Sequence, residues 1–132
     1  MTENELGLHN IDKSFTKEIE ETKAKIYDGS LRSGIKIEYD GTVVVLGDIN
    51  AGSEVIAGEN VIALGTIRGL AHAGATGNRA AIIVANEILA PQLRIADIIT
   101  RQPDGEHKNM EIIPEMAFVK DDRMYIEEFL HR

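Results

Sequence analysis

The apolar residues between positions 42 and 78 recur every six residues, a spacing that fits neither an α-helix nor a single β-strand. Counting in sixes from Val43 gives apolar side chains at every step: Val43, Ile49, Val55, Val61, Ile67 and Ala73. The series from Val45 is small after its first member: Val45, Ala51, Ala57, Ala63, Gly69 and Ala75. The series from Asp48 is polar throughout: Asp48, Glu54, Asn60, Thr66, His72 and Asn78. Steps of eighteen restore whole identities, as in Gly47/Gly65 and Asn60/Asn78, so the full repeat is eighteen residues.

Three strand-and-corner units of six residues make one triangular turn of eighteen. The next turn then stacks on it at roughly 4.8 Å with parallel backbone hydrogen bonds. In this arrangement the large apolar series points inward, the small series fills the second inward row, and glycines lie at corners of close approach. The glycine- and alanine-rich stretch 61–78 is therefore interpreted as one whole turn of an all-β solenoid, stabilised by the turns above and below it.

The repeat continues beyond Asn78 if about three residues are inserted near Arg79, which aligns Ile67 with Ile88 and Ala75 with Ala96. A solenoid exposes strand edges at both ends, and these must be covered. The alternating segment that starts at Ile35, "IKIEY", is one candidate cover. The other is a hairpin formed by "MAFVK" and "RMYIEEF" around Asp121 and Asp122.

The first thirty residues differ from the rest because they are polar. Within "DKSFTKEIEETKAKIY", residues 12–27, helical spacing puts Phe15, Ile19 and Ile26 on one face, which predicts a short amphipathic helix. We therefore divide the chain into a polar, partly helical arm or linker (residues 1–30) and a β-helix domain (residues 31–132).

Charge and composition narrow the function. The 132-residue chain has a formal net charge of −8, which disfavours binding to nucleic acid or directly to an anionic membrane. It has no cysteine, no stretch typical of a signal peptide and no apolar run long enough to span a bilayer, so the expected location is the cytoplasm.

No motif for catalysis or cofactor binding stands out. Gly69 and Gly74 are spaced as in a phosphate-binding loop, but the lysine that such a loop requires is absent. His72 belongs to the polar series and has no suitably spaced carboxylate or nucleophile, which favours a surface histidine over a catalytic base. The remaining histidines show no metal-ligand spacing. We expect no enzyme activity, no cofactor and no metal.

The segment "LRSG" leads into the first strand of the repeat. Read structurally, it is a lead-in turn. Read functionally, it is a contact loop, because Arg32 offers a planar fork of donors, Ser33 a hydroxyl and Gly34 a close backbone approach. The residue types alone do not decide between these two interpretations.

The stretch from "LRSG" to "QLRIAD", with "GDINAGSEVIAGENV" and "RGLAHAGATGN" between them, resembles the C-terminal domain of the MinC septum-site determining proteins. The resemblance implies a right-handed triangular β-helix that forms a homodimer and binds the membrane-associated ATPase MinD. It further implies that MinD carries the nucleotide and the membrane contact, and that the pair positions inhibition of FtsZ assembly, which this chain would affect only indirectly. The implied MinD-binding residues are Arg32, Ser33 and Gly34, together with Glu59 in the turn "AGEN".

Two features depart from that family. Ile35 stands where the entry motif usually has glutamine, and the 31 residues before Arg32 are too few for the N-terminal FtsZ-antagonising domain that family members usually carry. The outward residues Val44, Ile56 and Ile62 form a candidate apolar row for dimerisation. Two other functions stay open: a self-assembling scaffold of the bactofilin kind and, less favoured, a hexad-repeat acyltransferase.

Overall fold

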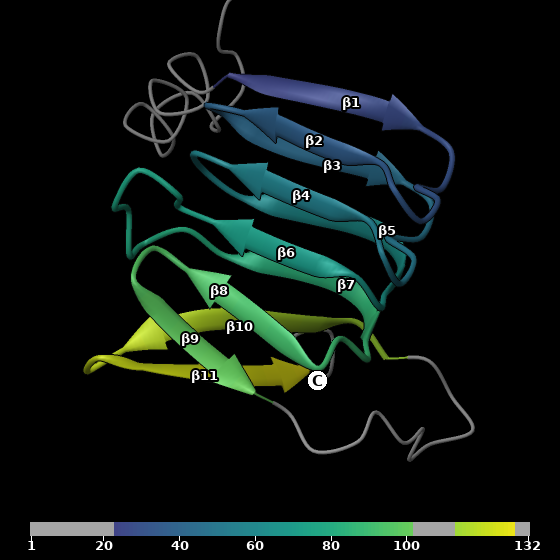
Figure 1. Cartoon of the computed structure of the whole chain (residues 1–132). Helices are drawn as coiled ribbons and strands as arrows, with labels where there is room; N and C mark the ends of the chain where they lie inside the picture. The colour runs from purple at the N-terminus through teal and green to yellow at the C-terminus, as the bar shows by residue number, and fades with distance from the viewer. Residues whose placement is uncertain (1–22, 102–112, 129–132) are drawn as a thin grey trace, which may run out of the picture.

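The computed structural model describes residues 23–101 and 113–128, and all regular structure in these two ranges is β (Figure 1). The strands, in chain order, are β1 (Ala24–Asp28), β2 (Lys36–Tyr39), β3 (Thr42–Leu46), β4 (Glu54–Ala57), β5 (Val61–Ile67), β6 (Leu70–Ala73), β7 (Ile83–Ile88), β8 (Gln92–Ile95), β9 (Ile98–Arg101), β10 (Glu115–Lys120) and β11 (Arg123–Glu128).

From β1 to β8 the chain passes back and forth between two sheets, so that successive strands belong to different sides of one coil. The six-stranded sheet has the order β1-β3-β5-β7-β10-β11, and the five-stranded sheet has the order β2-β4-β6-β8-β9. Pairing from β1 to β7 and from β2 to β8 is parallel, as stacked turns require. The third side is narrow and consists of parallel bridges that join Leu31, Ile49 and Ile67. The predicted triangular β-solenoid is confirmed.

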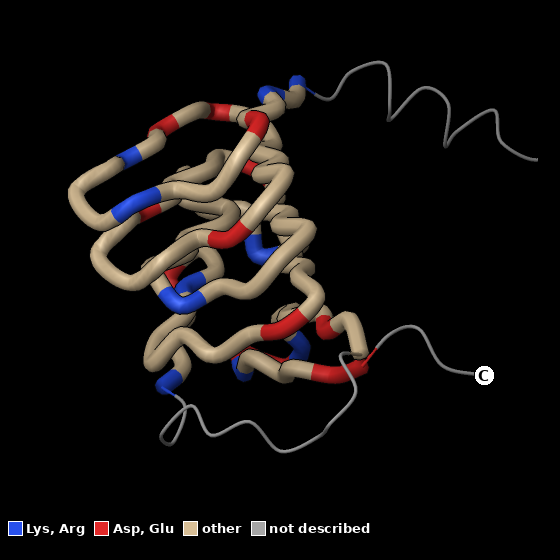
Figure 2. The backbone as a smooth tube through the Cα atoms, turned by 90° about the vertical axis from the view of Figure 1, so that its right-hand side faces the viewer, with Lys and Arg blue, Asp and Glu red and all other residues tan. Residues whose placement is uncertain are grey.

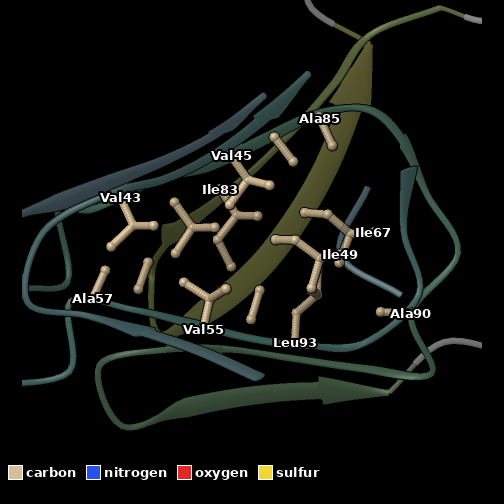
Figure 3. Close-up of a cluster of buried hydrophobic side chains, with 14 of the residues drawn as sticks. Val43, Val45, Ile49, Val55, Ala57, Ile67, Ile83, Ala85, Ala90 and Leu93 are labelled. Atoms are coloured by element: carbon tan, nitrogen blue, oxygen red, sulfur yellow. The ribbon is translucent and has the colours of Figure 1, made fainter. Parts of the chain in front are cut away.

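The core is a set of vertical columns of aliphatic side chains that point inward from the three sides (Figure 3). Val43 pairs with Val61, which pairs with Ile83, and all three are completely buried. All six members of the apolar series counted from Val43 are completely buried as well. The small series is less uniform, because Ala57 and Ala63 fill the core while Ala51 is exposed in a turn.

The spacing between turns is eighteen residues at first and then changes. Val43 lies eighteen residues before its partner Val61, but Val55 pairs with Ala71, only sixteen residues further on. A longer loop before β7 then increases the spacing, so that Ile67 pairs with Ile88, as predicted. The predicted alignment of Ala75 with Ala96 is wrong, because Ala73 pairs with Ile95. A single insertion cannot reproduce one shortened and one lengthened connection.

Glycine at the corners permits a ladder of polar side chains between turns. Ser30 Oγ accepts a hydrogen bond from the Asp48 backbone N–H at 2.8 Å, and Asp48 Oδ1 accepts one from the Thr66 N–H at 2.8 Å. A Cβ on Gly65 would collide with Asp48 Oδ1, and a Cβ on Gly47 would lie 2.6 Å from Ser30 Oγ. These two glycines are therefore required by the turn stacked on them, as the repeat predicted for corners of close approach.

The first described strand corrects the prediction for the polar arm. Ala24–Tyr27, expected to end a helix, belong to β1, which pairs in parallel with β3 from Ala24–Thr42 to Asp28–Leu46. Pairing with an exposed strand edge outweighs a weak helical pattern, because it satisfies a whole row of backbone groups. Ile26 is 64% exposed on this strand, and the earlier part of the predicted helix lies outside the described residues.

The C-terminal hairpin is confirmed. β10 and β11 pair antiparallel on either side of Asp121 and Asp122, whose φ angles of 55° and 64° suit the tight turn. β10 also pairs with β7 and thereby covers the last parallel strand of the six-stranded sheet. At the opposite end, β1 and β2 are the first strands of their sheets, which gives the segment from Ile35 its expected edge position.

Candidate docking site

The sequence "LRSG" forms a tight turn at the corner between the narrow side and the five-stranded sheet. The Ile35 N–H donates to the Arg32 carbonyl at 3.0 Å, and Gly34, third in the turn, has a φ of +94°. A β-turn with positive φ at its third position favours glycine there. The side chains of Arg32 and Ser33 are exposed, so the turn presents both of them to the outside.

A second turn of the same kind, formed by residues 50–53, stacks against the first in the next turn of the coil. The Ser53 N–H donates to the Asn50 carbonyl at 3.0 Å, and Gly52 has a φ of +86°. The Gly34 N–H donates to the Gly52 carbonyl at 2.9 Å, which holds the two turns together. A Cβ on Gly52 would collide with Ser33 Oγ, so the lower turn supports the upper one through backbone packing.

The third layer of this corner is shorter, and the space below the second turn forms a shallow groove. The spacing between paired residues of successive turns falls to sixteen at this corner. The reason is that the inward residue Ala71 follows Ile67 after only four positions. The groove has a volume of about 440 Å³ and is lined by Ala51, Gly52, Ser53, Glu54, Arg68, Gly69, Leu70, Pro91 and Gln92.

Two arginines and Glu54 carry the charge of this corner. Arg68 follows Arg32 by two repeats of eighteen, with Asn50 between them, and the bridges joining Leu31, Ile49 and Ile67 place the three residues in one column. Both arginines are exposed, and neither has an ion pair with a residue that the structure describes. Arg68 was missed in the sequence analysis, although steps of eighteen from Arg32 lead to it.

Glu59 lies at a different corner. It lies two residues after the end of β4, whereas the turn that contains Ser53 precedes β4, so this strand separates Glu59 from the Arg32 corner. Glu59 Oε1 accepts a hydrogen bond from Asn78 Nδ2 at 3.2 Å, and the Glu59 carbonyl accepts one from the Gly74 N–H at 2.7 Å. These bonds join successive turns. The structure brings Arg32, Ser33 and Gly34 together, but not Glu59 with them.

The remaining charges form no catalytic arrangement within the described ranges. Basic and acidic residues both occur along the coil from its first turn to its last (Figure 2). His72 lies on the outer face of the five-stranded sheet, and its Nε2 is 3.0 Å from the Ala96 carbonyl oxygen rather than from a carboxylate. No group of three or more His, Cys, Asp or Glu side chains suited to a metal ion occurs in residues 23–101 and 113–128.

Comparison with known proteins identifies the family. The model for "Septum formation inhibitor MinC, C-terminal domain" matches residues 25–129. The chain belongs to the MinC C-terminal domain family. Its relatives include the probable septum site-determining protein MinC of Acetivibrio thermocellus, 46% identical over 88% of this chain, and that of Persephonella marina, 41% identical over 93%.

A solved structure agrees with the fold. A chain of the MinC:MinD cell division protein complex of Aquifex aeolicus superposes with a TM-score of 0.76 at 31% identity, covering 84% of this chain and 90% of that one. The sequence relatives are longer than this MinC domain, which spans 51% of the Acetivibrio protein and 63% of the Persephonella protein. In the described residues, no helix has the length and apolar character needed to cross a membrane.

Proposed function

We propose that this chain is a non-enzymatic, homodimeric adaptor that docks on the ATPase MinD and so helps to position inhibition of FtsZ assembly during cell division. The single observation that carries the proposal is the stacked pair of glycine turns that present Arg32 and Ser33, in a family member whose solved relative is a MinC:MinD complex. Recruitment to the membrane follows from binding MinD, with no direct lipid contact by this chain.

The charge at the docking corner indicates what the partner presents. Arg32 and Arg68 lie in one column two turns apart, roughly 10 Å by the spacing of stacked strands. A guanidinium with no ion pair binds carboxylates through two parallel hydrogen bonds. The matching surface of MinD is therefore expected to carry acidic side chains. Ile35, exposed beside them in place of the usual glutamine, adds an apolar contact instead of a hydrogen bond. A contact through Glu59 stays a prediction.

We propose that the homodimer forms through the outer face of the six-stranded sheet. Ile26, Val44, Ile62 and Val84 form a continuous outward row across β1, β3, β5 and β7, flanked by Leu46 and Leu64. Leu46 and Leu64 are 40% and 56% exposed, so this aliphatic face favours burial against a second copy. Ile56, which the sequence analysis grouped with Val44 and Ile62, lies instead on the five-stranded sheet.

The alternatives are less well supported. A scaffold that stacks end to end needs open solenoid ends, whereas the hairpin β10–β11 covers the last parallel strand of the six-stranded sheet. An acyltransferase needs a histidine base held by an oriented polar partner, and His72 contacts a backbone carbonyl.

The proposal is tested by co-sedimentation of the chain with MinD, ATP and lipid vesicles. The parent chain is expected to sediment only when both MinD and ATP are present. Arg32→Glu should weaken this binding by about tenfold or more, because reversal of a contact charge repels the carboxylates it normally attracts. Arg32→Lys keeps the charge but loses the planar fork, so its binding should be intermediate.

Arg123→Glu is the matched control, because Arg123 is exposed on β11, the end strand of the six-stranded sheet, whereas the docking corner adjoins β2 and β4 of the five-stranded sheet. It should bind like the parent chain. Equal binding by Arg32→Glu and the parent would exclude the docking corner. Filaments of the chain alone in electron micrographs, without MinD binding, would favour the scaffold.

A further inference from the structure

The outer face of the five-stranded sheet is basic toward its C-terminal end. β6, β8 and β9 lie side by side there (Figure 1), and their outward side chains are Leu70, His72, Gln92, Arg94, Ile99 and Arg101. None of these is acidic, although the whole chain has a formal net charge of −8. A locally positive face on an acidic protein attracts a negatively charged partner.

Strand register brings the three cationic or ionisable groups close together. His72 pairs with Arg94 across the parallel strands β6 and β8. Across the antiparallel strands β8 and β9, Gln92 pairs with Arg101 and Arg94 pairs with Ile99, which makes Arg94 and Arg101 diagonal neighbours. Diagonal neighbours on one face are about 7–8 Å apart, so a single acidic segment can reach both arginines.

Arg94 lacks the partner that its position calls for. Its side chain is half-buried, and its Nε is enclosed by protein without a hydrogen bond. It also has no ion pair with any residue in the described ranges. An enclosed donor without an acceptor destabilises the free chain, so a carboxylate that draws the guanidinium outward restores the missing bond.

This basic face continues into the docking corner. Leu70 and Gln92, outward residues of β6 and β8, also line the groove below the turn that contains Gly52. Arg68 lines the same groove. Four arginines without an ion pair among the described residues, Arg32, Arg68, Arg94 and Arg101, therefore lie along one corner and the sheet face that adjoins it.

We propose that Arg94 and Arg101 are additional contact residues, and that the outer face of β6, β8 and β9 binds carboxylate side chains of MinD. This inference rests on the proposed function, because it extends the same docking surface. An acidic protein segment fits this face better than a lipid headgroup does. Apolar side chains lie between the cations, with Ile99 48% exposed, and the face is continuous with the docking corner.

The test measures the dissociation constant of the full chain for ATP-bound MinD by light scattering or calorimetry at several salt concentrations. Arg94→Glu is expected to weaken binding about tenfold and Arg101→Glu several-fold, while Arg94→Lys keeps most of the affinity. Arg94→Gln should also weaken the dependence of affinity on salt, because one charge contact is lost. A purely structural role for Arg94 would not change that salt dependence.

Arg123→Glu is again the matched control and should leave both affinity and salt dependence unchanged. Thermal unfolding of the Arg101 variant should match the parent chain, and the Arg94 variants should be at least as stable as the parent, because they remove the enclosed donor. If Arg32→Glu loses binding while Arg94→Glu and Arg101→Glu bind like the parent, this inference is overturned and the proposed function stands. If the parent does not bind MinD, both fail. Binding to anionic vesicles without MinD that Arg94→Glu abolishes would assign the face to lipid and overturn the inference.

Discussion

At the scale of single residues, the corners of the coil accept fewer residue types than its sides do. A side position needs only an aliphatic residue of suitable volume, whereas Gly65 faces the Asp48 side chain and the Gly47 backbone at contact distance. Asp48 in turn accepts the hydrogen bond of the Thr66 N–H. A side chain at Gly65 therefore disturbs both the packing and a part-buried hydrogen bond.

Gly65→Ala is predicted to lower the free energy of unfolding by about 1–3 kcal/mol, the usual cost of forcing a methyl group into a packed site. The measurement is chemical denaturation followed by circular dichroism. Ala80→Ser, at an exposed position of the loop before β7, is the control and should unfold like the parent chain. A stability of Gly65→Ala equal to that of the parent would mean that the corner is looser than the structure indicates.

The residues of the proposed docking surface differ in how well the sequence predicts them. Arg32, Ser33 and Gly34 were predicted from the resemblance of "LRSG" to the entry motif of the family, and the structure places them in one turn with Gly34 at positive φ. Arg68 could have been found by the eighteen-residue step, but Arg94 could not. Its register with His72 depends on one shortened and one lengthened connection, and its pairing with Ile99 depends on the antiparallel strands β8 and β9; periodicity reveals neither.

At the scale of elements, Arg79 joins three segments near the C-terminal end of the solenoid. From the loop before β7 it donates to both carboxylate oxygens of Asp97, at 2.8 and 2.7 Å, and to Asp122 in the turn between β10 and β11 at 2.5 Å. The hydrogen bonds from the Arg79 guanidinium lower the pKa of Asp97 from 3.8 to about 2. The two carboxylates raise the pKa of Arg79.

The lowered pKa of Asp97 predicts how the stability of the folded chain changes at acid pH. Because the pKa of Asp97 is lower in the folded chain, its contribution to stability is present above its ordinary pKa of 3.8 and is lost as the pH falls toward 2. The difference in unfolding temperature between the parent and Asp97→Asn should therefore shrink as the pH falls through this window. An NMR titration should give the Asp97 carboxyl a pKa of about 2 in the parent and a higher one in Arg79→Gln. A pKa near 3.8 in the parent would contradict the cluster.

The elements were predicted unevenly, for physical reasons. The repeat and the hairpin depend on patterns that many residues share, so they could be predicted. β1 could not, because Ile26 fits a helical stripe as well as a strand and only the free edge of β3 decides between them. Stacking on a neighbour is a tertiary effect that overrides local propensity.

At the scale of the whole molecule, the solenoid offers different chemistry on its sides. The outer face of the six-stranded sheet is aliphatic from Ile26 to Val84. The corner beside the five-stranded sheet and its adjoining face carry arginines that have no ion pair with any residue in 23–101 and 113–128. A coil of only a few turns keeps these surfaces rigid relative to each other, because every turn is hydrogen-bonded to the next. The proposed self-association and the proposed docking on MinD therefore use different surfaces and do not compete.

The assignment of the dimer to the six-stranded sheet predicts an asymmetry between two chemically similar substitutions. Ile62→Glu puts a charge in the aliphatic row and should convert the dimer to a monomer, because burying an unpaired carboxylate at an interface is unfavourable. Ile56→Glu is matched in residue type, outward position and half-burial but lies on the other sheet, so it should stay dimeric. Sedimentation equilibrium gives the mass of each, with circular dichroism to confirm folding. A monomeric parent chain, or a dimer lost only in Ile56→Glu, would exclude the outer face of the six-stranded sheet as the dimer interface. Loss of the dimer only in Ile62→Glu would support that interface and leave the arginine-bearing face free to bind MinD.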